Sequence, residues 1–159
     1  MNPQPSPVTF CSALFDLERY GPRRRPTSEY LRLGQEVLRQ PVPLILFLDK
    51  TLKDRFPETE DNHTVLFLDP EDLPTWKMRD KLTEAFERRG RLESTKDTAE
   101  YLCLQNAKWF FVSEAAKLSD SPVLSWIDLG IAHCCPDLDL LPEIATKPQW
   151  DHLTVGVSH

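Results

Sequence analysis

Four short and almost wholly apolar runs constrain what this chain can fold into. They cover residues 8–17 (VTFCSALFDL), 42–48 (VPLILFL), 64–68 (TVLFL) and 123–127 (VLSWI). Strands that read as continuous apolar runs, rather than as alternating ones, are typical of a parallel sheet with helices on both faces. Because helical patterns separate most of the runs, right-handed crossovers would place the strands side by side. We therefore predict an α/β fold: a Rossmann-like, three-layer sandwich with a mostly parallel sheet.

The segments between the runs predict the helices and the limits of the domain. Thr27 or Ser28 can cap a helix that continues at helical spacing to Leu38 and is ended by Pro41. We also expect a short helix over 52–56, a long one over 76–89, and one over 98–118 that is interrupted near Asn106. Residues 1–7 are polar and proline-rich, which predicts a disordered lead-in. The α/β domain is assigned to residues 8–135, and residues 136–159 to a Pro-rich C-terminal extension.

Length and charge limit the possible functions. The chain has 159 residues, enough for one domain, and a net charge of -6 with an isoelectric point near 5.2. Nucleic acids and anionic membranes attract clustered Lys and Arg, so an acidic chain is a poor candidate for binding either. The one basic cluster, Arg23 to Arg25, is interpreted as a solvated loop.

The four cysteines favour a reducing compartment. They show no CxxC spacing, and Cys11 and Cys103 lie in apolar runs as small core residues. No signal peptide is recognisable, and no apolar run approaches the roughly 20 residues that a membrane span needs. We therefore expect a cytoplasmic protein without a transmembrane segment.

An aspartate closes each of the four apolar runs: Asp16, Asp49, Asp69 and Asp128. In an open parallel sheet, ligands bind outside the carboxyl ends of the strands. Carboxylates there can accept hydrogen bonds from ribose hydroxyls or ligate Mg²⁺ or Mn²⁺. Each of them also has a structural interpretation, because Asp is favoured at turns and helix N-caps. That interpretation is strongest for Asp69, which precedes Pro70, and weakest for Asp128.

The segment 125–133 (SWIDLGIAH) combines an acid at a strand end with a glycine and a histidine. Together with three other segments, it resembles the HtrL-like (WlaTC/HtrL) family of bacterial glycosyltransferases. The other segments are Thr9–Arg19 (TF-x-x-A-x-F-D-x-x-R), Pro43–Asp49 (PLxxFxD) and Asn106–Ala115 (N-x-K-x-x-F-V-x-x-A). The matches extend over residues 8 to 133, and W-I-D-x-G-I-x-H is the most specific of them.

The resemblance implies a GT-A-like fold and transfer of a sugar from a nucleotide-sugar donor to an unknown glycan or protein acceptor. In related transferases an Asp-x-Asp metal motif stands where this chain has W-I-D-x-G, so Gly130 replaces the second acid. The resemblance implies that Asp128 would ligate a divalent Mn²⁺ or Mg²⁺. His133 is a candidate metal ligand or hydrogen-bond partner, and its structural alternative is a helix-surface or core histidine. The resemblance assigns no catalytic base. The donor would be bound by Asp16, Arg19, Asp49, Lys108, Trp126 and Gly130.

A complete domain of this type continues well beyond W-I-D-x-G, whereas this chain ends at residue 159. We therefore expect it to be truncated at the C-terminus relative to that family. It is then either a transferase or a degenerate nucleotide-sugar-binding or protein-interaction domain without catalysis.

Other α/β functions fit less well. A phosphotransferase or phosphatase of this class would want an Asp-x-Asp at a strand end, and none is present. The chain also has no G-x-G-x-x-G after its first strand and no phosphate-binding P-loop motif.

Overall fold

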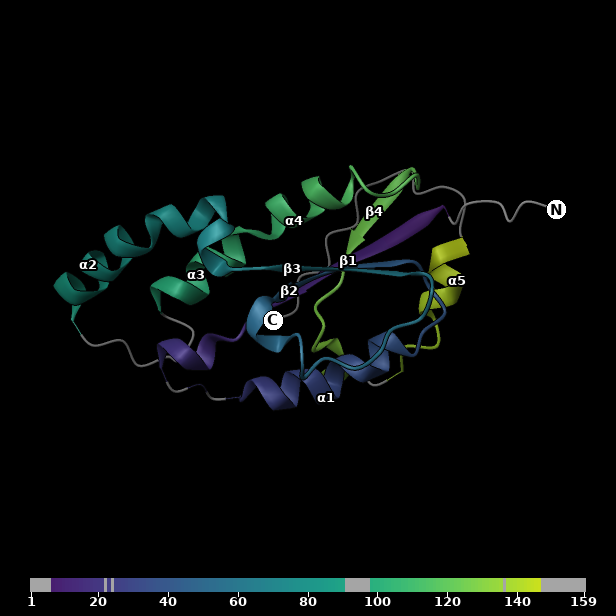
Figure 1. Cartoon of the computed structure of the whole chain (residues 1–159), viewed down its shortest axis with the longest axis horizontal. Helices are drawn as coiled ribbons and strands as arrows, with labels where there is room; N and C mark the ends of the chain where they lie inside the picture. The colour runs from purple at the N-terminus through teal and green to yellow at the C-terminus, as the bar shows by residue number, and fades with distance from the viewer. Residues whose placement is uncertain (1–6, 22, 24, 91–97, 136, 147–159) are drawn as a thin grey trace.

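The computed structural model describes residues 7–21, 23, 25–90, 98–135 and 137–146. Within these residues the fold is built on one parallel sheet of four strands in the order β3-β2-β1-β4 (Figure 1). The strands are β1 (Val8–Leu14), β2 (Leu44–Asp49), β3 (His63–Leu68) and β4 (Val123–Trp126). The predicted α/β class and parallel sheet are therefore confirmed.

Apolar side chains make the two central strands suitable for burial on both faces. Every residue of β2 is buried, and β1 is buried except at Ala13. β3 and β4 form the edges of the sheet, and their apolar side chains are only partly covered. Continuous apolar runs thus predicted a doubly covered sheet, although full burial is confined to its centre.

Helices cover both faces of this sheet (Figure 1). One face carries α1 (Thr27–Leu38), the 3₁₀ turn η5 (Ile131–His133) and α5 (Leu141–Thr146), whose apolar residues share a core with alternate residues of β1 and β2. The other face carries α3 (Ala99–Asn106) and α4 (Lys108–Ala115). These layers match the predicted three-layer sandwich.

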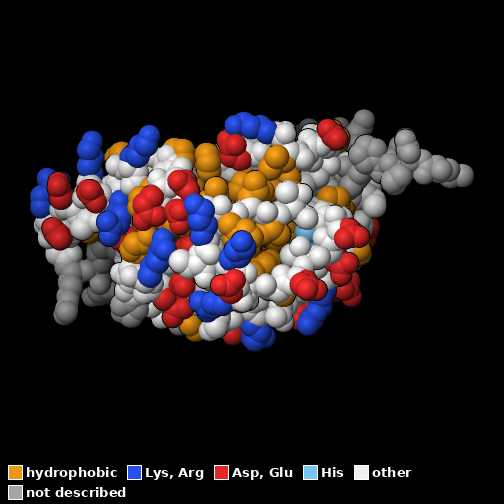
Figure 2. Space-filling model, viewed as in Figure 1, with side chains coloured by type: hydrophobic (Ala, Val, Ile, Leu, Met, Phe, Trp, Pro, Cys, Tyr) orange, Lys and Arg blue, Asp and Glu red, His pale blue; other side chains and the backbone are white. Residues whose placement is uncertain are grey.

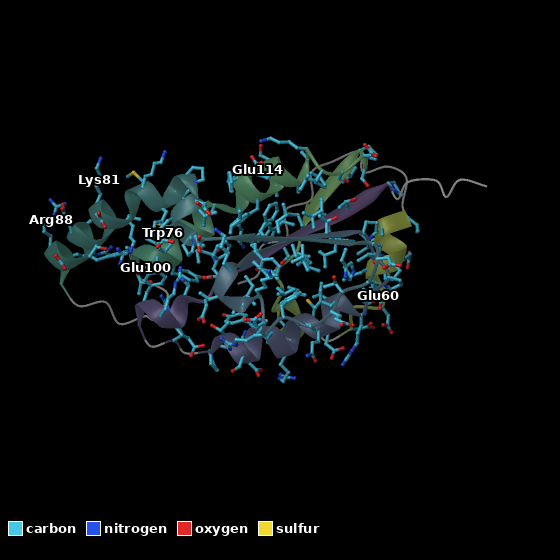
Figure 3. All side chains as sticks on the ribbon, in the orientation of Figure 1. Glu60, Trp76, Lys81, Arg88, Glu100 and Glu114 are labelled. Atoms are coloured by element: carbon cyan, nitrogen blue, oxygen red, sulfur yellow. The ribbon has the colours of Figure 1, made fainter. Side chains whose placement is uncertain are left out.

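Between β3 and α3 the chain forms two 3₁₀ turns, η3 (Pro70–Asp72) and η4 (Pro74–Met78), and then α2 (Arg79–Arg89). No described residue of α2 is buried. Its first residue joins it to α3, because Arg79 Nε donates to Oε1 of the buried Glu100 over 2.9 Å. Figure 3 shows Glu100 and Trp76 in this layer, and Lys81 and Arg88 on α2 farther out.

Several sequence predictions need adjustment. The helix expected over 52–56 is a 3₁₀ turn, η2 (Lys50–Leu52), that begins two residues earlier. The helix expected over 76–89 starts as η4 and becomes α-helical at Arg79. The break expected near Asn106 is found at Ala107. The predicted extension contributes α5 to the core through Leu141 and Ala145, whereas most of the lead-in and residues 147–159 lie outside the described residues.

The strand order places a reversal beside β1. β1 leads through α1 to β2 on one side, whereas the chain returns from β3 through α2, α3 and α4 to β4 on the other side. Ligands of open α/β sheets bind at the carboxyl end of the strands where the order reverses, here between β1 and β4. In the part of the chain that the structure describes, no helix is long and apolar enough to cross a membrane.

Candidate functional site

Asp49 ends β2 as a fully buried carboxylate with a side-chain exposure of 0%. Its Oδ2 accepts from the backbone N–H of Asp16 over 3.2 Å, which ties the ends of β1 and β2 together. Its Oδ1 accepts from the backbone N–H and the hydroxyl of Thr51, at 3.0 and 2.8 Å, and so caps η2. The Arg19 guanidinium lies 3.7 Å from Oδ2. These contacts give Asp49 a structural role at the strand ends.

Asp16 organises the connection from β1 to α1. Its Oδ1 accepts from the Thr27 hydroxyl over 2.8 Å and from the Glu18 N–H over 3.1 Å. Its Oδ2 lies 3.4 Å from Nη1 of Arg55. Glu18 in turn accepts the Thr27 N–H over 2.7 Å, which satisfies a free donor at the start of α1.

Arg19 lies beside this network in η1 (Leu17–Tyr20). Besides Asp49, it approaches Oε2 of Glu71 within 3.8 Å, and its guanidinium lies 4.9 Å from the Tyr20 ring centre. About a third of the side chain is exposed, 31%. Arg19 therefore keeps part of its surface open to a ligand while two carboxylates orient it.

A second group of polar side chains gathers at the end of β4. Asp128 Oδ1 accepts from Nζ of Lys108 over 3.0 Å and from the Trp126 indole N–H over 2.8 Å. The Lys108 ammonium also lies 5.2 Å from the centre of the Trp126 ring, a cation–π distance. The Phe111 ring stacks on the Trp126 ring, with 6.1 Å between their centroids. The side chains of Lys108, Trp126 and Asp128 therefore form one unit, in which Lys108 and Asp128 remain partly exposed.

The end of β4 lies at a step in the sheet. β4 pairs with β1 only as far as Cys11, whereas β2 follows β1 to Leu14. At about 3.3 Å per residue, this difference places the end of β4 about 10 Å short of the end of β1. The unit formed by Lys108, Trp126 and Asp128 is thus set back from Asp16.

Two tyrosines from other helices lie near the segment that follows β4. Burial raises the pKa of Tyr101, on α3, and the neighbouring Tyr30 and Asp128 raise it further. Tyr30, on α1, contacts the backbone of the segment after β4. An ideal Cβ on Gly130 would lie 2.8 Å from the Tyr30 ring. Gly130 was expected among the donor-binding residues, and in the structure its close neighbour is this ring.

Asp69 and His133 have partners of their own. Asp69 ends β3 and pairs with Nζ of Lys50 over 2.6 Å. The hydrogen bond that Lys50 donates to Asp69 raises the pKa of Lys50. The Nδ1 of His133 lies 2.7 Å from the carbonyl oxygen of Gly130. In residues 7–21, 23, 25–90, 98–135 and 137–146, no group of three or more His, Cys, Asp and Glu side chains could hold a metal ion. The metal site predicted at Asp128 and His133 therefore has no support from this geometry.

Sequence reasoning missed four participants in these networks: Thr27, Arg55, Tyr30 and Tyr101. Arg55 and Asp16 are 39 residues apart, and no motif links them. Thr27 was identified only as a helix cap. The clearest available signal was the strand-end aspartates, since each of them needs a donor or a cation nearby.

The molecular surface carries both signs of charge. Figure 2 shows acidic and basic side chains interspersed on the face it presents, with apolar patches between them. A surface hollow of about 370 Å³ lies at the other end of α1 from Thr27, lined by Glu36, Gln40, Asp137, Leu138 and Asp139. It is separate from the strand-end aspartates.

Comparison with known proteins gave no match for this chain among protein-family models, curated protein sequences or solved structures. The fold and its carboxyl edge therefore define the class: an α/β protein of the Rossmann-like type, with a polar and aromatic unit where the strand order reverses.

Proposed function

We propose that this chain is the nucleotide-sugar-binding domain of a glycosyltransferase. One observation carries the proposal: Lys108, Trp126 and Asp128 form a single unit at the end of β4, beside the reversal of strand order. Ligands of open α/β sheets bind at such a position. The resemblance to HtrL-like glycosyltransferases, which covers the same three residues, supports the donor as a nucleotide sugar.

The residues suit the parts of such a donor. An ammonium group binds phosphate oxygens as a compact charge, and Lys108 is exposed enough to do so. Aromatic faces stack on bases or on sugar rings. The Trp126 indole bonds Asp128, the Tyr30 ring lies against Gly130, and the charge of Asp128 raises the pKa of Tyr101. Arg19 and Asp16 would contact the nucleoside from the end of β1. Asp49 would act indirectly, by holding Asp16 and Arg19.

Transfer breaks the bond between the anomeric carbon and the diphosphate oxygen, and the electron pair leaves with the diphosphate. The new bond forms to an acceptor hydroxyl, whose proton passes to a base that we do not assign to any residue. The diphosphate gains negative charge in this step, so a fixed cation beside it stabilises the transition state more than the ground state. Lys108 has the chemistry for that role.

The cellular setting belongs to the same proposal. All four cysteines are free thiols, and burial raises the pKa of Cys11 to about 12, so this group stays protonated. We propose a cytoplasmic protein that meets its donor there and acts on a glycan or protein acceptor, without binding nucleic acid.

Isothermal titration with UDP-glucose, UDP-galactose, GDP-mannose and dTDP-glucose, followed by product analysis, tests the function. We expect one donor to bind, and Asp128→Ala to weaken that binding about tenfold or more, because Lys108 loses its anchor. Asp120→Ala is the matched control, since this exposed aspartate precedes β4 instead of following it. Binding without hydrolysis or transfer would favour a non-catalytic binding module. No binding by the folded chain to any donor would contradict the proposal.

A further inference from the structure

Each strand-end aspartate already forms an ion pair with a Lys or Arg side chain of the same chain. The four ion pairs join Asp16 to Arg55 at 3.4 Å, Asp49 to Arg19 at 3.7 Å, Asp69 to Lys50 at 2.6 Å and Asp128 to Lys108 at 3.0 Å. This regularity matters because the resemblance to metal-dependent transferases implies a divalent ion at the same edge of the sheet.

The donor set does not fit such an ion. Mg²⁺ and Mn²⁺ need several oxygen ligands, usually one or two carboxylates together with waters and phosphate oxygens. At Asp128, Oδ1 accepts from both Lys108 and Trp126. His133 has its Nδ1 against a backbone carbonyl, and Asp49 is fully buried with its oxygens engaged. Without displacing the Lys108 ammonium or the Trp126 indole from Oδ1, an ion at Asp128 would have only Oδ2 of this carboxylate as a ligand.

Lys108 occupies the position beside Asp128 that a bound metal ion would take. It is the first residue of α4, and its ammonium is fixed from two sides, by Asp128 and by the face of Trp126. An ammonium group has three donors, and its bond to Asp128 uses one of them. With a side-chain exposure of 33%, Lys108 can direct the others toward an anion.

We propose that Lys108 itself supplies the positive charge that faces the diphosphate of the ligand, and that the chain binds this group without a divalent ion. Asp128 is then a positioning residue that holds the ammonium, with Trp126, in a fixed direction. This inference rests on the proposed function, which names the ligand but leaves the source of the counter-charge open.

The test measures binding of UDP, GDP, ADP and inorganic pyrophosphate in EDTA and again in Mn²⁺. We expect at least one of these probes to bind equally well in EDTA, and Lys108→Gln to weaken it about ten- to a hundredfold, as expected for loss of a charged hydrogen bond. Lys117→Gln is the matched control, because this exposed lysine follows the same helix and pairs only with nearby Glu114 among its described ion pairs.

A double variant separates two roles of Lys108. Lys108→Gln also uncovers the charge of Asp128, which would repel an anion by itself. If Lys108→Gln with Asp128→Asn binds the probe as tightly as the unmodified chain, then Lys108 only screens Asp128 and the inference is wrong. Weak binding by the double variant, with a native circular dichroism spectrum, would support a direct contact.

The outcomes distinguish this inference from the proposed function. Diphosphate binding that appears only with Mn²⁺ would overturn the inference and leave the nucleotide-sugar function standing. Mn²⁺ binding to the free chain, measured by electron paramagnetic resonance and abolished in Asp128→Asn, would overturn it as well. No binding of any probe in either condition would contradict both.

Discussion

At the scale of single residues, Asp49 and Asp128 occupy equivalent positions in sequence but different environments. Both close an apolar run, yet Asp49 is fully buried, whereas Asp128 has 59% of its side chain exposed. A buried carboxylate is tolerated only when its oxygens are satisfied, and removing it leaves its donors unpaired. The two residues therefore allow a direct test of structural against ligand-facing roles.

We expect Asp49→Ala to lower the free energy of unfolding by about 2–5 kcal/mol, since it leaves the N–H groups of Asp16 and Thr51 and the charge of Arg19 without their partner. Asp128→Ala should cost only about 0–1 kcal/mol, because exposed ion pairs contribute little. Urea denaturation followed by circular dichroism measures both. Equal losses for the two variants would show that burial does not separate their roles.

His63 should make stability depend on pH. Burial lowers the pKa of His63 below its ordinary 6.5, an effect that nearby Glu60 and the backbone of Gln40 and Val42 oppose. Glu60 lies at the amino end of β3, away from α2 (Figure 3). The unfolded chain then binds the proton at higher pH than the folded chain does. Stability from neutral His63 is therefore fully present above 6.5 and is lost as pH falls through 6.5 toward the folded pKa.

Thermal unfolding between about pH 7.5 and 5 tests this linkage. The original chain should lose more stability over this range than His63→Gln, which keeps a polar side chain but cannot titrate. Parallel losses in the two chains would mean that other groups account for the whole pH dependence.

At the scale of elements, close contact between α1 and the segment after β4 depends on a glycine. An ideal Cβ on Gly34 would lie 2.7 Å from Cγ of the buried Leu129. This contact brings the chain that carries Asp128 against α1, near Tyr30. A methyl group in a filled core forces neighbouring side chains or backbone to move.

We expect Gly34→Ala to destabilise the protein by about 1–3 kcal/mol, although alanine is the better helix former by about 1 kcal/mol. Gln35→Ala, at the next and exposed position of α1, is the matched control and should change stability little. Differential scanning calorimetry would measure both. A Gly34→Ala chain that is as stable as the original, or more stable, would show that Leu129 moves aside freely.

Sequence patterns predicted elements well where local signals were strong. The apolar residues of α1 repeat at helical spacing before Pro41, and the structure has α1 at Thr27–Leu38. The predicted cap is wrong, because Pro26 occupies the N-cap position and the Thr27 hydroxyl donates to Asp16 instead. Sequence patterns did not predict α5, because six residues are too few to show a helical period. Contacts of Leu141 and Ala145 with the core stabilise this helix instead. The segment after Asp49 became a 3₁₀ turn because the Asp49 side chain caps it.

At the scale of the whole molecule, the sequence predicted the class of fold and the edge where polar groups gather, but not how they pair. Apolar runs and their closing aspartates are local signals. Pairing of Asp16 with Arg55, or of Lys108 with Asp128, joins residues 39 or 20 positions apart and depends on strand order and helix placement. The step between the ends of β1 and β4 is likewise a property of register, which no single run contains.

We propose above all that a nucleotide sugar binds at the end of β4, beside the reversal of strand order. The most direct test is a ¹⁵N–¹H correlation spectrum recorded during titration with the nucleotide sugar that binds best in calorimetry. The Trp126 indole signal, assigned by its loss in Trp126→Phe, is a reporter within the site because that N–H bonds Asp128. We predict that this signal and the backbone amides of Lys108 and Gly130 shift together and saturate with one affinity. Shifts confined to the hollow lined by Glu36 and Gln40, with the Trp126 indole unmoved, would contradict the claim.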